Sequence, residues 1–176
     1  MEGTARARIL AQMLAGYQAY FDIRHEERIG GLAFAATAEF HSRSEKYLLT
    51  QKAQLWAAEN HEYCYFAAME HLDAALAQRY LAAARADGLA RVRPHCEHMY
   101  SDICLVLLAD TLSDGAAALI AHSDYHKAFL LTLHGWADFR VAALATASGR
   151  IWHNKRGKAL AARLRQAVQR ADESPR

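Results

Sequence analysis

The sequence is poor in the residues that mark linkers, disulfide frameworks and membrane spans. Its 176 residues include only two prolines and nine glycines, which excludes long flexible linkers. The three cysteines, at positions 64, 96 and 104, form no Cys-x-x-Cys pair, so neither a disulfide framework nor a zinc finger is expected. There is no apolar run of about 18 residues and no signal-peptide core, so we predict a cytoplasmic protein without a membrane span.

Size and charge indicate an ordinary globular chain. The hydrophobic fraction is 53% and the charged fraction is 23%, which suits a folded core. The formal net charge of +2 implies no polyanion partner for the whole surface. We therefore predict a single α+β domain over residues 1–176.

Hydrophobic periodicity predicts the order α-β-β-β-α-β-α-β-β-α, with one mainly antiparallel sheet flanked by three longer helices. Thr4 and Ser113 are expected to cap helices, Gly30-Gly31 to turn a hairpin, and Gly88 to end a helix. The run 103–108 is apolar on both faces, which is typical of a central strand. Helices are expected at 4–20, 70–87, 113–121 and from 155, and strands at 21–25, 32–43, 55–66, 100–109, 129–136 and 140–147.

A polar strand face is the best candidate site. In an extended chain His134, Trp136, Asp138 and Arg140 project to the same side. Asp138 can then orient His134, and Arg140 can hold a carboxylate or phosphate. Gly135 is interpreted as a bulge or as a place where another backbone comes close. The competing interpretation is a solvated strand face with an ordinary Asp–Arg pair.

The chain contains ten histidines, which are common metal ligands. His95 and His98 flank Cys96, and His122 lies four residues before His126. Each group is a pair without a third ligand at a diagnostic spacing, and no His-Glu-x-x-His motif occurs. We therefore assign no metal site and name no cofactor. His126, which can share a strand face with His134, is added to the ligand-binding set.

The last fifth of the chain is strongly basic. Residues 139–171 contain eight basic residues and no acidic one. Asn154, Lys155, Arg156 and Lys158 lie near a helix start, where phosphate groups can bind. They are predicted to bind an anion, and nucleic-acid binding through this helix is one alternative function. The competing interpretation is that the basic segment pairs with acidic residues elsewhere in the same chain.

A second alternative is a metal-dependent hydrolase. The initial order of helix, three strands, helix and strand resembles the core of the restriction-endonuclease-like nucleases, which carry an acidic residue on the second strand and Glu-x-Lys on the third. Here the nearest match is Glu39 with Glu59-Asn60-His61, and the lysine is absent. Other polar residues of these two strands are His41, Arg43 and Glu62.

The last third of the chain resembles a small family of uncharacterised prokaryotic proteins. The resemblance lies in a His-Gly-Trp segment around His134-Gly135-Trp136 and in a basic Asn-x-Arg-Gly turn at 154–157. It implies a cytosolic prokaryotic protein and supplies no activity. Serine-hydrolase, P-loop and Rossmann motifs are lacking. Our leading hypothesis is a binding or regulatory module, in the form of a homodimer, that engages a small anion or a protein partner; whether it is an enzyme stays open.

Overall fold

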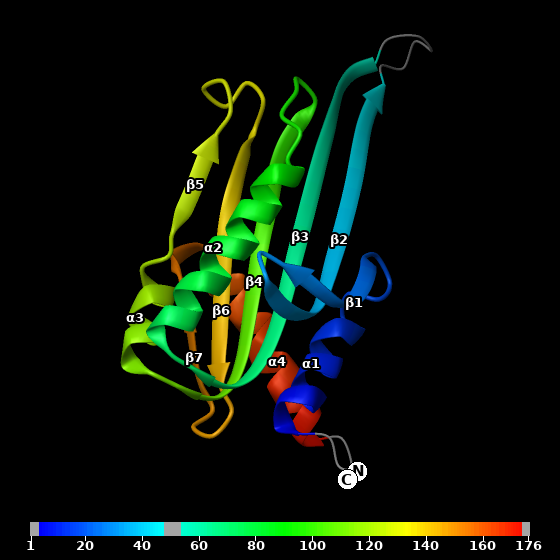
Figure 1. The fold of residues 1–176 in the computed structure, drawn as a ribbon. Helices are drawn as coiled ribbons and strands as arrows, with labels where there is room; N and C mark the ends of the chain where they lie inside the picture. Colours follow the sequence, from blue (N-terminus) through cyan, green and yellow to red (C-terminus); the bar gives the residue numbers. More distant parts are fainter. Residues whose placement is uncertain (1–3, 48–53, 174–176) are drawn as a thin grey trace.

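A computed structural model describes residues 4–47 and 54–173, except the side chains of 43–47 and 54–58. The described chain forms four α-helices, one short 3-10 helix and seven strands (Figure 1). In chain order these are α1 Ala5–Ala15, β1 Asp22–Ile29, β2 Leu32–Tyr47, β3 Gln54–Leu72, α2 Ala74–Arg91, β4 His98–Leu112, α3 Asp114–Ala121, β5 Tyr125–Ala128, β6 Trp136–Ala145, β7 Arg150–His153, η1 Lys155–Gly157 and α4 Lys158–Glu173.

All seven strands belong to one mixed sheet. Its order is β1-β2-β3-β4-β6-β5, and β7 pairs with β6 beyond the end of β5. The first three strands are antiparallel, whereas β3, β4 and β6 run parallel to one another. The prediction of a mainly antiparallel sheet is therefore wrong at its centre. The reason is that α2 carries the chain back to the starting end of β3 before β4 begins, and such a crossover makes the two strands parallel.

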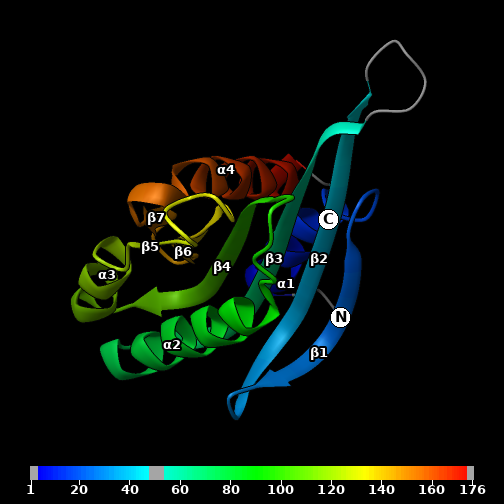
Figure 2. The same cartoon turned by 90° about the horizontal axis from the view of Figure 1, so that it is seen from above.

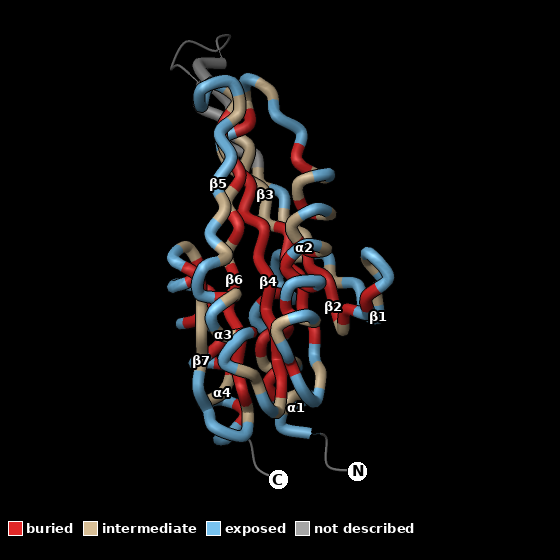
Figure 3. The backbone as a smooth tube through the Cα atoms, turned by 60° about the vertical axis from the view of Figure 1, so that its left-hand side comes forward, coloured by how far each residue is buried: buried red, intermediate tan, exposed pale blue. Residues whose placement is uncertain are grey.

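Helices cover both faces of the sheet. Seen from above, α2 lies on one side and α4 on the other (Figure 2). One buried cluster joins α2 and α3 to the sheet through Tyr80, Ile103 and Phe139, and the other joins α1 and α4 to it through Met13, Val106 and Leu164. The buried positions run along β4 and β6 (Figure 3). No helix in the described ranges is long and apolar enough to cross a membrane.

Several local predictions are confirmed. The Thr4 and Ser113 hydroxyls accept hydrogen bonds from the backbone N–H groups of Ala7 and Ala116, and they thereby cap α1 and α3. Gly30 and Gly31 have φ of 58° and 76° between paired strands, as a two-residue hairpin turn requires. The strand β4 is central and buried on both faces.

Some boundaries differ from the predictions. The first helix ends at Ala15, and α2 begins at Ala74 because Asp73 caps it. Gly88 lies inside α2 instead of ending it. A Cβ atom at Gly88 would lie 2.6 Å from Cγ2 of Ile103, so glycine lets the helix approach the sheet closely.

Two strand predictions are corrected. Residues 129–135 form a turn in which Leu130, Leu131 and Thr132 all have positive φ, so the predicted strand 129–136 is absent. The strand before this turn is β5, and β6 starts at Trp136. The predicted order α-β-β-β-α-β-α-β-β-α also lacks β7, which follows β6 in the structure. The alternation of apolar and polar residues in 32–43 predicts that the apolar side chains of β2 share one side of the sheet. Instead, Leu32 and Phe34 contact the α2 cluster, while the alanines that follow contact the α1–α4 cluster.

Candidate functional site

Three carboxylates lie side by side across the three parallel strands. Glu62 of β3 is in register with Asp102 of β4, and Asp102 is in register with Asp138 of β6. Two residues further on, Cys64 and Cys104 contact the α1–α4 cluster, so the carboxylates face the same side of the sheet. We call Glu62, Asp102 and Asp138 the carboxylate row.

Each member of the carboxylate row is paired with an arginine. Arg163 Nη1 lies 3.2 Å from Glu62 Oε1, Arg140 Nη2 lies 2.9 Å from Asp102 Oδ2, and Arg156 Nε lies 2.7 Å from Asp138 Oδ1. Sequence reasoning missed Glu62 and Asp102 as partners of these arginines. A signal existed for Asp102, because it lies directly before the run 103–108, which is apolar on both faces of the same strand.

The spacing of two of these arginines matches the spacing of the strands. Arg156 and Arg163 are seven residues apart, which is about 10.5 Å along a helix. Glu62 and Asp138 lie two strands apart, which is roughly 9.5 Å. The stretch from Arg156 to Arg163 therefore lies across the carboxylate row, and an ion pair holds it at each of these two residues.

The predicted strand face lies at the β6 end of this row. Trp136 stacks on Tyr100 with ring centroids 6.0 Å apart, and His126 Nδ1 lies 2.6 Å from Asp138 Oδ1. Arg140, next along β6, binds Asp102. His134 does not join them, because it lies in the turn before β6. There its carbonyl oxygen lies 2.7 Å from His98 Nδ1, and its backbone N–H donates to Phe129 O at 3.2 Å.

A cavity of about 430 Å³ opens at the β3 end of the row, between α1 and α4. Its charged lining residues are Glu62, Arg163 and Arg170. The remaining lining is largely aromatic and apolar, and includes Met13, Tyr17, Tyr20, Phe21 and Phe40. Volume and composition fit a site for a small organic molecule.

The Tyr17 hydroxyl links the cavity wall to the row. It accepts a hydrogen bond from Arg163 Nη1 at 3.3 Å, and the same nitrogen reaches Glu62. Burial is the main reason why the pKa of Tyr17 is raised, so its hydroxyl keeps its proton. The site therefore offers a neutral hydroxyl, a carboxylate and a guanidinium within one hydrogen-bonded group.

Asp102 is the most perturbed carboxylate of the row. Burial raises its pKa from 3.8 to about 6, against the opposing effect of Arg140, while Glu62 adds to the rise. Its Oδ1 atom is buried and has no hydrogen-bond partner among the described residues. The ionised form thus costs stability at neutral pH, and this cost disappears as the pH falls from about 6 to about 4.

We expect Asp102→Asn to change the pH dependence of stability. Because the folded-state pKa exceeds the unfolded one, the variant should gain relative to the wild type by about 2 kcal/mol on going from pH 4 to pH 7. Urea unfolding at both pH values measures this difference. The exposed Asp22→Asn is the matched control, and parallel stability curves for Asp102→Asn and the wild type would contradict the expectation.

One set of metal-ligand types lies beneath the cavity. Side-chain ligand atoms of Glu62, Cys64 and Cys104 lie within 4.8 Å of one another. Burial raises the pKa of the Cys64 thiol well above its ordinary value, and Arg163 already neutralises Glu62. The group is therefore better suited to closing the floor of the cavity than to attracting a cation.

The predicted anion-binding residues do not converge on one site. Asn154 is fully buried, and its amide bonds Val141 N, Phe139 O and Ser123 O within the fold. Arg156 is bound by Asp138, while Lys155 and Lys158 are exposed. Asn154 is thus structural. The intramolecular pairing of Arg156 and Arg163 also removes much of the charge on which nucleic-acid binding would depend.

The residues of the hydrolase alternative lie on the other face of the sheet. Glu59 and His61 alternate with Glu62 along β3, so they point toward the α2 side, and His61 is in register with His41 of β2. Glu39 lies on the same side and forms an ion pair with Arg91 of α2. The side chain of Arg43 lies outside the described residues.

Residues 6–166 match the family described as "Domain of unknown function (DUF8052)", and the chain therefore belongs to this family. No curated protein and no solved structure matches the chain. The match is consistent with the expectation that the chain belongs to an uncharacterised family. It assigns no activity, so function has to be argued from the site.

Proposed function

We propose that this member of the DUF8052 family is a binding module that takes a small organic anion with an apolar body into the cavity between α1 and α4. The lining of the cavity is the main support for this proposal. The cavity combines an aromatic and apolar lining with a few convergent polar groups, as small-molecule sites commonly do.

The charges of the lining favour an anionic ligand. The lining contains the guanidinium groups of Arg163 and Arg170 and one carboxylate, that of Glu62. A ligand carboxylate, sulfonate or phosphate can accept hydrogen bonds from Arg163 in place of Glu62, because guanidinium groups suit planar and tetrahedral oxyanions. The apolar body of the ligand then packs against Phe21 and Phe40.

The strand face predicted from the sequence has a positioning role in this proposal. Asp138 and Asp102 hold Arg156 and Arg140, and Arg156 belongs to the segment that leads into α4. One wall of the cavity is α4, so the Asp138–Arg156 pair fixes that wall relative to the sheet, while the Asp102–Arg140 pair joins β4 to β6 beneath it. Trp136 and His126 extend the same polar surface beyond the cavity.

Anilinonaphthalene sulfonate tests the proposal because it joins an aromatic body to an anionic group. We expect saturable fluorescence enhancement with one probe per chain and a Kd in the micromolar range. Gln12 lines the cavity, so Gln12→Trp should fill it and weaken binding at least tenfold, because the ring takes the volume of the probe. Fluorescence titration provides the measurement.

The matched control is Gln18→Trp, which adds the same ring at an exposed position outside the cavity. This variant should bind the probe like the wild type, and near-ultraviolet circular dichroism should show both variants folded. Equal binding by Gln12→Trp and Gln18→Trp, or no saturable binding by the wild type, would contradict the proposal.

A prokaryotic source, a cytoplasmic location, a homodimeric state and a protein partner stay predictions from the sequence. Catalysis forms no part of the proposed function.

A further inference from the structure

The turn between β5 and β6 exposes three leucine side chains. Leu130, Leu131 and Leu133 are 63%, 93% and 72% exposed. In the described part of the chain, the only other exposed large apolar side chains are those of Met99 and Tyr20. A single exposed leucine is ordinary, whereas a group of them in one short turn is typical of a surface that meets an apolar partner. We call Leu130, Leu131 and Leu133 the leucine tip.

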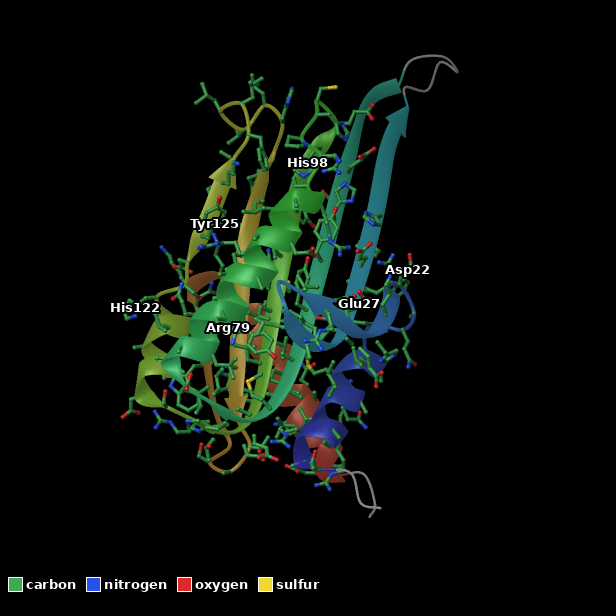
Figure 4. All side chains as sticks on the ribbon, viewed as in Figure 1. Asp22, Glu27, Arg79, His98, His122 and Tyr125 are labelled. Carbon is green, nitrogen blue, oxygen red and sulfur yellow. The ribbon has the colours of Figure 1, made fainter. Side chains whose placement is uncertain are left out.

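The leucine tip projects beyond the end of the sheet. Strands β5 and β6 are antiparallel and pair as far as Ala128 and Trp136, so the turn that joins them extends past the last paired residues. Figure 1 shows this turn above the upper end of α2, and Figure 4 shows side chains of the turn spreading outward above His98. The tip is therefore a convex apolar projection.

The backbone of the turn holds the leucines in this exposed position. Leu130, Leu131 and Thr132 have φ of 47°, 51° and 74°, a left-handed conformation that is uncommon for leucine and threonine. Across the turn, the N–H of His134 donates to Phe129 O at 3.2 Å. Strained conformations of this kind concentrate at functional sites. Backbone preference disfavours leucine at positions 130 and 131, so a contact outside the chain best accounts for it.

The base of the leucine tip combines an aromatic ring with a cation. Phe129 packs against the core on the α2 side and meets the ring of His98 edge to face, with centroids 6.0 Å apart, so it anchors the turn. Lys127 is exposed, and its Nζ lies 5.4 Å from the centroid of Phe129. No acidic residue occurs in residues 125–137. A lysine behind an apolar tip can stay among lipid headgroups while the tip enters the membrane.

A lipid surface fits this projection better than a second protein chain. A standard protein interface takes about 20–30 residues from each partner. The tip offers three leucines and the neighbouring Met99, and two convex tips would touch at few points. A membrane surface yields around a projection, and anionic headgroups complement the charge of Lys127 and the net charge of +2.

We propose that the leucine tip inserts into the interface of a membrane that contains anionic lipids, with Lys127 at the level of the headgroups. The leucines enter the apolar boundary while the sheet and the helices stay outside, so the association is peripheral and requires no spanning helix. It is reversible, because one short turn and one cation supply the contact. This surface is separate from the small-molecule cavity, which lies between α1 and α4.

Sedimentation of the full chain with vesicles of equal parts phosphatidylcholine and phosphatidylglycerol tests this proposal. We expect the bound fraction to rise to saturation with lipid concentration. Leu130→Asn combined with Leu131→Asn should lower the partition coefficient at least tenfold, because two apolar side chains no longer enter the membrane. Lys127→Gln should lower it about fivefold on these vesicles, and should leave binding to pure phosphatidylcholine vesicles unchanged.

The asparagine variant also separates membrane insertion from a structural role of the leucines. Asparagine tolerates positive φ better than leucine, so urea unfolding should show this variant to be no less stable than the wild type. The matched control is Leu130→Met combined with Leu131→Met, which keeps both side chains apolar and should bind within about twofold of the wild type.

Two results with vesicles would overturn the proposal: no binding by the wild type, or equal binding by the asparagine and methionine variants. Sedimentation velocity without lipid provides a further check. A wild type that is dimeric, together with an asparagine variant that is monomeric, would show that a second copy covers the leucine tip, and the membrane proposal would fall.

Discussion

Replacing Gly135 with alanine is expected to lower the free energy of unfolding by about 4 kcal/mol. The Cβ atom of alanine would lie 2.2 Å from the carbonyl oxygen of Met99 and 2.6 Å from that of His98. These are backbone atoms at the start of β4, so no side-chain rotation can relieve the contact. Gly135 also has a φ of 74°, which L-amino acids rarely adopt.

The consequence of the substitution extends beyond local strain. Gly135 directly precedes Trp136, which is in register with Tyr100 at the start of the β4–β6 pairing. Moving the β4 backbone away from an alanine therefore separates the first pair of the two central parallel strands. The sequence left two interpretations of Gly135 open, a bulge or the close approach of another backbone, and these contacts support the second.

Gly149 provides the matched control for this prediction. Its φ of 68° is nearly the same, but a Cβ atom there would meet nothing within 4 Å. Gly149→Ala should therefore cost only the conformational penalty, about 1 kcal/mol. Urea denaturation of both variants measures the difference. Equal losses would show that backbone strain alone acts at Gly135, and the argument from close contact would fail.

The sequence predicted most elements but not how the chain connects them in space. Alternation and capping depend on near neighbours, which is why the caps at Thr4 and Ser113 and the Gly30-Gly31 turn were recognised. Strand direction in the centre of the sheet depends on where α2 returns the chain, and no local pattern reports that. Gly88 illustrates the same limit. Glycine is needed there because the backbone of α2 lies close to the side chain of Ile103, which belongs to a different element.

Only part of the candidate site could be predicted from the sequence. Spacing alone placed Trp136, Asp138 and Arg140 on one strand face, since the two-residue period of a strand is local. His134 was included wrongly because three residues with positive φ turn the chain before β6 begins. The partners Asp102 and Arg163 depend on strand register and helix placement, so they required the structure.

Asn154 supports a second prediction of large effect. Its side chain is fully buried between β6, η1 and the loop before β5. The amide oxygen accepts from Val141 N–H at 3.0 Å, and the amide nitrogen donates to the carbonyls of Phe139 at 2.8 Å and Ser123 at 3.3 Å. Asn154→Ala removes the side-chain partner of two buried backbone groups and of the partly buried Ser123 carbonyl, so we expect a loss of about 4 kcal/mol in unfolding free energy.

The same substitution separates a structural role from the anion-binding role predicted for this segment. An anion-binding asparagine could be removed without loss of stability, whereas the observed hydrogen bonds require destabilisation. Asn154→Asp should be as harmful as Asn154→Ala, because a carboxylate can still accept from Val141 N–H but faces two carbonyl oxygens that need a donor. Urea denaturation measures both variants against Lys155→Ala, an exposed neighbour that should stay within about 0.5 kcal/mol of the wild type. If Asn154→Ala were as stable as Lys155→Ala, the amide would not be holding η1 against β6, and the placement of Arg156 on the carboxylate row would need another explanation.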